Sequence, residues 1–155
     1  MDIFIEPVLP RPQIVICGAS PVAVAIAEFG RRIGFDITIC ASAADQTAFG
    51  EAERRIEGYA LPVTEPSSRF VVVSTQGRGD EAALQSALAV EADYVAFVGS
   101  RKKAAALKAK LAASGVAPER LARLKAPAGL DLGAITPEEI AVSIIAEIVA
   151  ARRGK

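Results

Sequence analysis

The chain has 155 residues, 52% of them hydrophobic and 23% charged, and this balance predicts one globular domain with a substantial core. The formal net charge is +0, so no overall field attracts the protein to nucleic acid or to an anionic membrane surface. Histidine is absent and the chain has 2 cysteines, which excludes Ser-His-Asp and Cys-His nucleophiles, His-ligated metals and cysteine-rich metal sites within one chain.

The first residues are acidic and then rich in proline. Residues 1–6 lack the basic and apolar pattern of a signal peptide, and no stretch approaches the roughly 18 apolar residues of a membrane span. We therefore expect a cytoplasmic protein without a membrane span. Residues 1–12 are expected to be an extended lead-in or linker that lies across the surface, and residues 13–155 a single domain.

The most informative stretch is residues 13–25, where a β-branched run meets Gly18 and helical spacing begins at once. We predict a strand over 13–17, a helix over 21–33 and a second strand over 36–40. This succession is typical of the first βαβ unit of a dinucleotide-binding fold, whose turn directs backbone amides and a helix dipole toward an anion. The same residues also fit a tight βα turn without a ligand, and both interpretations stay open.

Two positions depart from the dinucleotide-binding pattern. Ser20 stands where a glycine usually lets the backbone approach a pyrophosphate, although its hydroxyl suits a helix cap. Cys40 stands where an acidic residue usually holds the ribose of NAD. Both changes weigh against standard NAD recognition. Ser42 with Arg54 or Arg55 leaves the 2′-phosphate of NADP as an alternative.

The segment after the second strand is weakly patterned. Residues 43–58 contain few large apolar side chains and are expected to form a loop with a short exposed helix, whose charged run 51–55 faces solvent. Residues 59–61 are expected to form a short edge strand before Pro62.

Two continuous apolar runs, residues 70–74 and 94–98, are typical of buried parallel strands. Between them Asp80 and Glu81 suit the start of a helix. Alternating strands and helices predict an α/β, Rossmann-like doubly wound fold: a mainly parallel sheet with helices on both faces and the 13–17 strand at its centre. The ligand crevice of such a sheet lies at the carboxyl ends of the strands. It would be bordered by residues 18–21, 40–42, 74–80 and 99–103.

The turn at Ser100 carries its own signal. Ser100 suits a helix cap, yet Arg101, Lys102 and Lys103 place three cations in the first turn, where each is disfavoured by about 0.3–1 kcal/mol. A bound phosphate would reverse this penalty, and the alternative is that the side chains bend into water. We favour the phosphate site because the cluster borders the predicted crevice.

Cys17 and Cys40 end neighbouring predicted strands, so their thiols are expected to face one another. They fit two small buried hydrophobic residues, with a dithiol for a soft ligand or a disulfide as the sharper alternative.

The last third of the chain is expected to contain a helix over 101–114, a helical turn over 118–121 and a sixth strand over 121–124. A loop rich in glycine and proline follows over 126–134 and permits close approach to a ligand or partner. The final helix begins at a Thr136 cap. Its wide apolar face is expected to cover the sheet, with a dimer interface as the second use.

These residues resemble the C-terminal Rossmann domain of the XdhC/CoxI family, accessory factors of xanthine dehydrogenase, carbon monoxide dehydrogenase and related molybdenum hydroxylases. The resemblance rests on residues 18–23, on Tyr94 with 98–103, and above all on residues 127–134 with 136–141. We expect a chain without the family's separate N-terminal domain. Pro21 and Gln76 stand where longer members are expected to carry histidine, so the chain is most similar to a stand-alone, CoxF-like member.

The resemblance implies a non-catalytic factor that binds the molybdenum cofactor, as molybdopterin or its dinucleotide, and delivers it to an apo-enzyme. The implied partners are a molybdenum hydroxylase and a separate protein carrying the family's N-terminal domain, with a homodimer as a further expectation. The rival hypotheses are an NAD(P)-binding oxidoreductase or redox-sensing module and a purely structural protein. The expected ligand contacts are Gly18, Ala19, Ser20, Pro21, Cys40, Gln76, Gly99, Ser100, Arg101, Lys102, Gly129 and Asp131.

Overall fold

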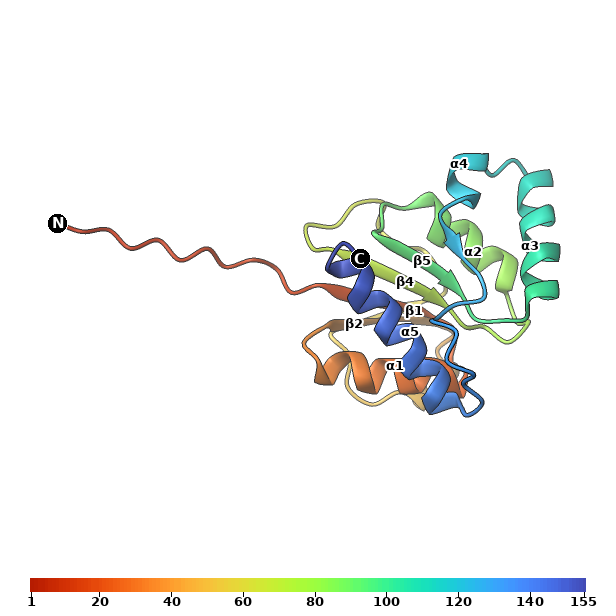
Figure 1. The fold of residues 1–155 in the computed structure, drawn as a ribbon, viewed down its shortest axis with the longest axis horizontal. Helices are drawn as coiled ribbons and strands as arrows, with labels where there is room; N and C mark the ends of the chain where they lie inside the picture. Colours follow the sequence, from red (N-terminus) through yellow and green to blue (C-terminus); the bar gives the residue numbers. More distant parts are fainter.

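The apolar runs of the sequence form a six-stranded, all-parallel sheet in the computed structural model, which describes residues 1–155 (Figure 1). The strands are β1 (Gln13–Cys17), β2 (Asp36–Ala41), β3 (Arg54–Glu57), β4 (Arg69–Val73), β5 (Tyr94–Phe97) and β6 (Leu124–Lys125). The helices are α1 (Pro21–Arg32), α2 (Asp80–Ala89), α3 (Arg101–Ala113), α4 (Pro118–Leu121) and α5 (Pro137–Arg152), with a 3-10 turn η1 (Asp45–Ala48).

The strand order is β3-β2-β1-β4-β5-β6, the order of a Rossmann fold, with β1 between β2 and β4. The predicted fold class is therefore confirmed. Because the chain crosses from the β2 side of β1 to the β4 side, the order reverses between β1 and β4. The turns that follow these two strands therefore border the point where ligands of such sheets bind.

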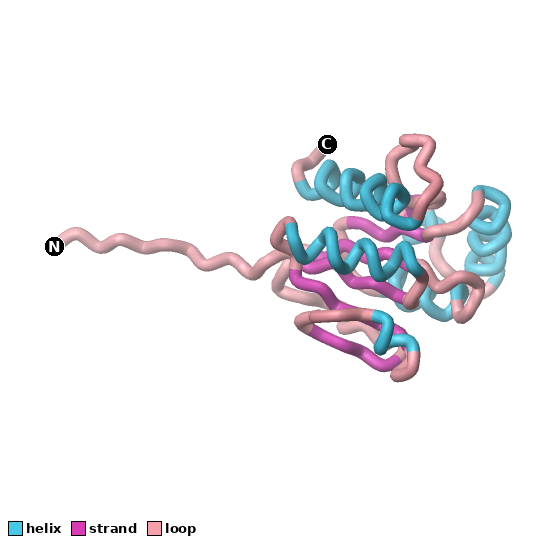
Figure 2. The backbone as a smooth tube through the Cα atoms, turned by 90° about the horizontal axis from the view of Figure 1, so that it is seen from below, coloured by secondary structure: helices cyan, strands magenta, loops and turns pink.

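Each face of the sheet is covered by its own helices, so the protein has two hydrophobic cores. Side chains alternate along β1, so Ile14 and Ile16 pack toward α1 and α5, whereas Val15 and Cys17 pack toward α2 and α3. Figure 2 shows α1 and α5 side by side over one face of the sheet. The apolar face of α5 thus covers the sheet, as expected.

The helices begin where their capping residues predict. The Ser20 hydroxyl accepts a hydrogen bond from the Ala23 amide and caps α1. Thr136 and Glu139 form a reciprocal capping box at the start of α5.

Three local predictions were wrong. Residues 43–58 contain the expected short helix as η1, but they also contain the edge strand β3, because Ile56 packs against the core beside the sheet while Arg54 pairs with Glu65 at the surface. Residues 59–61 form no strand, since β3 already occupies that edge. The sixth strand lies at Leu124–Lys125, because Leu121 still belongs to α4.

Residues 1–10 extend away from the body and do not lie across its surface (Figure 1). They are exposed and form no hydrogen bond with the rest of the chain. The first residue that does so is Arg11, whose side chain donates to the Gly34 carbonyl. None of the helices combines the length and the apolar character that crossing a membrane requires.

Candidate functional site

The turn between β1 and α1 is fixed by the neighbouring strands. The Gly18 amide donates to the Cys40 carbonyl at 2.9 Å, and a Cβ on Gly18 would lie 2.2 Å from the Ser74 carbonyl oxygen. Because φ is +106° and the Ser74 carbonyl is so close, the packing of the chain itself requires glycine here, whether or not a ligand binds. The Ser20 and Ser74 hydroxyl oxygens lie 2.5 Å apart and join the turn to the end of β4.

Amide donors remain at this turn. The N–H groups of Ala19, Ser20 and Val22 have no acceptor within the chain, while Ser20 itself is buried and Pro21 is exposed. They lie at the positive end of the α1 dipole, which favours an anion.

The loop after β4 is organised around the buried carboxylate of Asp80. Asp80 accepts hydrogen bonds from the Thr75 hydroxyl and the Gly77 amide, and its other oxygen lies 2.9 Å from Lys103 Nζ. Burial alone would raise the pKa of Asp80, but the hydrogen bonds from Thr75, Lys103 and Gly77 outweigh it and hold the pKa below its usual value. Gln76 stands exposed in this loop with φ at 53°.

The turn between β5 and α3 carries the predicted cationic cluster. Ser100 caps α3 by accepting a hydrogen bond from the Lys103 amide at 3.1 Å. The charge of Lys103 is already paired with Asp80, so only Arg101 and Lys102 remain without an ion pair. Their backbone amides likewise have no acceptor within the chain.

The loop over 126–134 is held to β5 and α5. The Ala128 amide donates to the Phe97 carbonyl at 3.0 Å, and the Leu130 amide donates to the Ser143 carbonyl at 3.1 Å. Between them the Gly129 amide donates to Glu147 Oε1 at 3.1 Å. These contacts fix the base of the loop while residues 130–133 stay exposed.

Glu147 connects this loop to the sheet, because its Oε1 also accepts a hydrogen bond from the Tyr94 hydroxyl at 2.5 Å. Burial and the neighbouring carboxylate raise the pKa of Tyr94 above its usual value. This network was not predicted from the sequence. A glutamate between Ile144 and Ile148 on the apolar side of α5 was the available signal.

A cleft of about 460 Å³ opens between the β5–α3 turn and this loop. Its lining residues are Val98, Gly99, Arg101, Pro127, Ala128, Gly129, Leu130, Asp131, Leu132, Gly133, Ala134, Ile140 and Ser143. Four of the expected ligand contacts therefore come together here: Gly99, Arg101, Gly129 and Asp131. The cleft offers one cation, one carboxylate and apolar walls.

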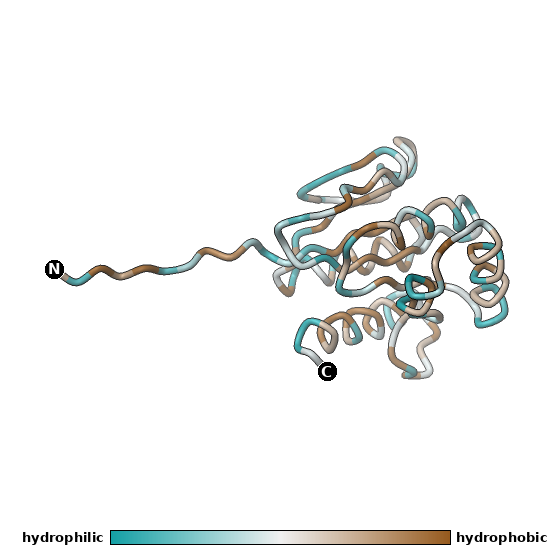
Figure 3. Tube along the Cα trace, turned by 90° about the horizontal axis from the view of Figure 1, so that it is seen from above, coloured by the Kyte–Doolittle hydropathy of each residue, from teal (hydrophilic) through white to brown (hydrophobic).

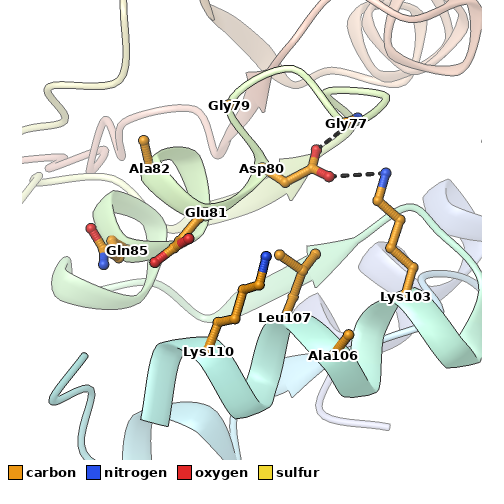
Figure 4. A pocket seen from close by; sticks show the side chains of 10 residues that line it. All are labelled: Gly77, Gly79, Asp80, Glu81, Ala82, Gln85, Lys103, Ala106, Leu107 and Lys110. Atoms are coloured by element: carbon orange, nitrogen blue, oxygen red, sulfur yellow. Dashed lines mark hydrogen bonds and ion pairs between the residues drawn. The ribbon is translucent and has the colours of Figure 1, made fainter. Parts of the chain in front are cut away.

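A second cleft, of about 620 Å³, lies between α2 and α3 (Figure 4). Lys103 and Lys110 line it from α3, and Asp80, Glu81 and Gln85 line it from α2.

The other expected contacts line neither of these clefts: Gly18, Ala19, Ser20, Pro21, Cys40, Gln76, Ser100 and Lys102. The Ser100 and Lys102 positions nevertheless adjoin Arg101 in sequence, so the β5–α3 turn belongs to the candidate site as a whole.

Cys17 and Cys40 are directly paired residues of adjacent strands, and both are free thiols with no exposed surface. Hydrogen bonding with the Cys40 thiol and complete burial raise the pKa of Cys17. Both cysteines therefore serve as buried hydrophobic residues. Because the Cys40 side chain is fully buried, its sulfur cannot contact a ligand bound above the sheet.

The groups considered for an NADP phosphate are already engaged. The Ser42 hydroxyl accepts from the Asp45 amide, Arg54 pairs with Glu65, and Arg55 donates to the backbone carbonyls of Gln46 and Gly50. No group of three or more potential metal ligands occurs in the chain.

Comparison with known proteins agrees with this architecture. The model of the XdhC Rossmann domain family matches residues 14–148. The chain belongs to this family. As an XdhC-family domain it is 32% identical over 157 residues to YqeB, an uncharacterized protein of Escherichia coli K12. It is 28% identical over 163 residues to a protein of Bacillus subtilis 168 described as a probable xanthine dehydrogenase subunit.

The alignments cover 96% and 98% of this XdhC-family chain but only 29% and 46% of the two relatives. A crystal structure described as a xanthine dehydrogenase from Bacillus halodurans superimposes with a TM-score of 0.76 at 24% identity. That match covers 94% of this chain and 44% of the other, and it shows the shared fold.

Proposed function

We propose that this domain serves the maturation of a xanthine dehydrogenase-type molybdenum hydroxylase by holding the molybdenum cofactor, or its dinucleotide form, and passing it to the apo-enzyme. Membership of the XdhC family and the similarity to a probable xanthine dehydrogenase subunit support the connection with that enzyme. The nature of the ligand rests on the cleft beside the β5–α3 turn.

The observation that carries the proposal is that Arg101 and Asp131 both line one cleft of about 460 Å³. This volume falls in the range of small-molecule sites, about 300–1,000 Å³. A pterin with a phosphate tail has a donor-rich pyrimidine edge at one end and an anion at the other. Asp131 suits the first, and Arg101 with the free amides of the α3 start suits the second.

The remaining parts of the crevice extend this assignment. Leu130 and Ile140 supply apolar wall for a flat ring, and the unpaired amides of Ala19 and Ser20 suit the further phosphate of a dinucleotide. The bound cofactor would supply the redox chemistry of the recipient enzyme. This chain contributes binding and orientation.

A binding experiment tests the proposal. We would titrate the purified domain under reducing conditions with molybdopterin, inorganic phosphate, NADH and NADPH, following pterin fluorescence and calorimetric heat. Arg101→Ala is expected to weaken both molybdopterin and phosphate by about 10- to 100-fold, the value of a charged hydrogen bond. Asp131→Asn is expected to weaken molybdopterin alone.

Arg32→Ala is the matched control, because Arg32 is an exposed arginine on α1 without an ion pair. Transfer is measured by adding the loaded domain to apo-xanthine dehydrogenase and following recovered activity. If NADH or NADPH binds saturably and molybdopterin does not bind, the carrier function is refuted and a redox function is supported. Absence of binding to every ligand would leave an assembly role.

A further inference from the structure

The outward face of α5 carries a stripe that nothing in the chain covers. Val142 and Val149 are 50% and 37% exposed, whereas Ala141, Ile144 and Ile148 of the same helix are buried against the sheet and α1. Figure 3 shows α5 largely in hydrophobic colours, with its polar end next to the C-terminus. The stripe consists of Glu138, Val142, Ala146, Val149 and Arg153, spaced so that all five lie on one side of the helix.

This stripe is nearly symmetric about its own midpoint, between Ile145 and Ala146. A valine lies at the same distance on each side, and beyond the valines stand Glu138 on one side and Arg153 on the other. Two copies related by a two-fold axis through this midpoint run antiparallel. Each Val142 then meets Val149 of the second copy, and each Glu138 meets Arg153 of the second copy.

The charges at the ends of the stripe are available for such contacts. Neither Glu138 nor Arg153 makes an ion pair or a side-chain hydrogen bond within the chain. The small side chain of Ala146 at the centre permits close approach of the two helices.

A shallow groove of about 290 Å³ lies at the acidic end of the stripe. It is lined by Leu132, Ala134, Glu138, Glu139 and Val142. In the antiparallel arrangement, Arg153 and Lys155 of the second copy approach this groove, so basic side chains meet its two carboxylates.

We propose that the outer face of α5 is the interface of an antiparallel homodimer of this chain. The inference is independent of the proposed ligand. Since α5 has 16 residues and is about 24 Å long, one helix pair with its flanking loop makes a small interface. We therefore expect a dissociation constant of about 1–100 µM.

Charge reversal tests this geometry. Association is measured by sedimentation velocity at protein concentrations up to about 200 µM, above the expected range of dissociation constants. Glu138→Lys and Arg153→Glu each place like charges opposite one another at both ends and are expected to weaken the dimer about 10-fold or more. The double variant restores opposite charges and is expected to dimerise again. An equimolar mixture of the two single variants is expected to form a heterodimer, because both of its charge pairs are then complementary.

The apolar part is tested by Val142→Asp, which is expected to give a monomer. Val63→Asp is its control, since Val63 is 63% exposed but lies far along the chain from α5. Circular dichroism confirms that each variant is folded. A monomeric wild-type protein, single variants that dimerise like wild type, or single variants that stay monomeric when mixed would each overturn the proposal.

Discussion

Gly129 is the residue at which a single added methyl group most directly tests how the 126–134 loop is held. Its φ of +95° is disfavoured for an alanine by about 1–2 kcal/mol. A Cβ would also lie 2.3 Å from Ser143 Oγ, 3.1 Å from Ser143 Cβ and 3.2 Å from Ile144 Cγ1. Overpacking of this kind adds about 1–3 kcal/mol. We therefore expect Gly129→Ala to lower the free energy of unfolding by about 2–5 kcal/mol.

Gly133 provides the matched control. Its φ is +70°, but no atom lies within 4 Å of the Cβ position, so Gly133→Ala carries only the backbone cost of about 1–2 kcal/mol. The two variants are compared by urea and thermal unfolding, where the difference between them corresponds to about 2–12 °C in Tm for a chain of this size.

A second substitution separates the clash from the backbone cost. In a Ser143→Ala background the 2.3 Å contact with Oγ is gone, but the contacts of 3.1 Å with Cβ of residue 143 and 3.2 Å with Ile144 Cγ1 remain. Adding Gly129→Ala to this background is therefore expected to cost less than it does in wild type, but still more than Gly133→Ala. Equal losses for the two glycine variants, or no coupling between positions 129 and 143, would refute the proposed close packing of the loop on α5.

Three further predictions concern buried side chains that can ionise. The pKa of Asp80 is held below its ordinary 3.8, so its contribution to stability is complete above that pH and is lost as the pH falls through the lowered pKa. Asp80→Asn is therefore expected to lose about 1–3 kcal/mol near pH 7 and to show less acid sensitivity in urea unfolding than wild type. Tyr94→Phe removes the hydroxyl bound by Glu147 and is expected to abolish the higher of the two tyrosine steps in an absorbance titration at alkaline pH, because the pKa of Tyr94 is raised. Cys17 and Cys40 are expected to react with a thiol reagent only after unfolding, with and without reductant, and a fast-reacting thiol in the native protein would contradict their burial.

Local sequence patterns were sufficient where one segment determines its own structure. The β-branched run before Gly18, the serine and proline that start α1, and the capping box at Thr136 all identified elements within about a residue of their observed ends. The continuous apolar runs of β4 and β5 correctly indicated strands buried on both faces, and the alternation of strands and helices correctly indicated a sheet with β1 at its centre.

The edge of the sheet was not predictable in the same way. β3 has only one apolar residue, Ile56, among charged neighbours, so its sequence is typical of a solvated loop. It becomes a strand because the exposed edge of β2 offers unpaired backbone groups, which is a property of the assembled sheet.

The candidate site divides similarly. Arg101 and Asp131 were singled out from their local motifs, and their place in one cleft came from the folding of the 126–134 loop across the end of β5. The binding roles of these residues remain predictions.

The sequence by itself determined the central βαβ pattern and the helix starts, because hydrophobic periodicity, capping residues and glycine turns act over a few neighbouring residues. The family followed from the resemblance of its motifs, above all residues 127–134 with 136–141. Only the tertiary structure decided that Lys103 is neutralised by Asp80, that Glu147 joins Tyr94 to Gly129, and that Gly18 is needed for the approach of Ser74. In each case the two partners are far apart in sequence or meet from different elements, and their interaction depends on distances that are set only when the sheet and its helices pack.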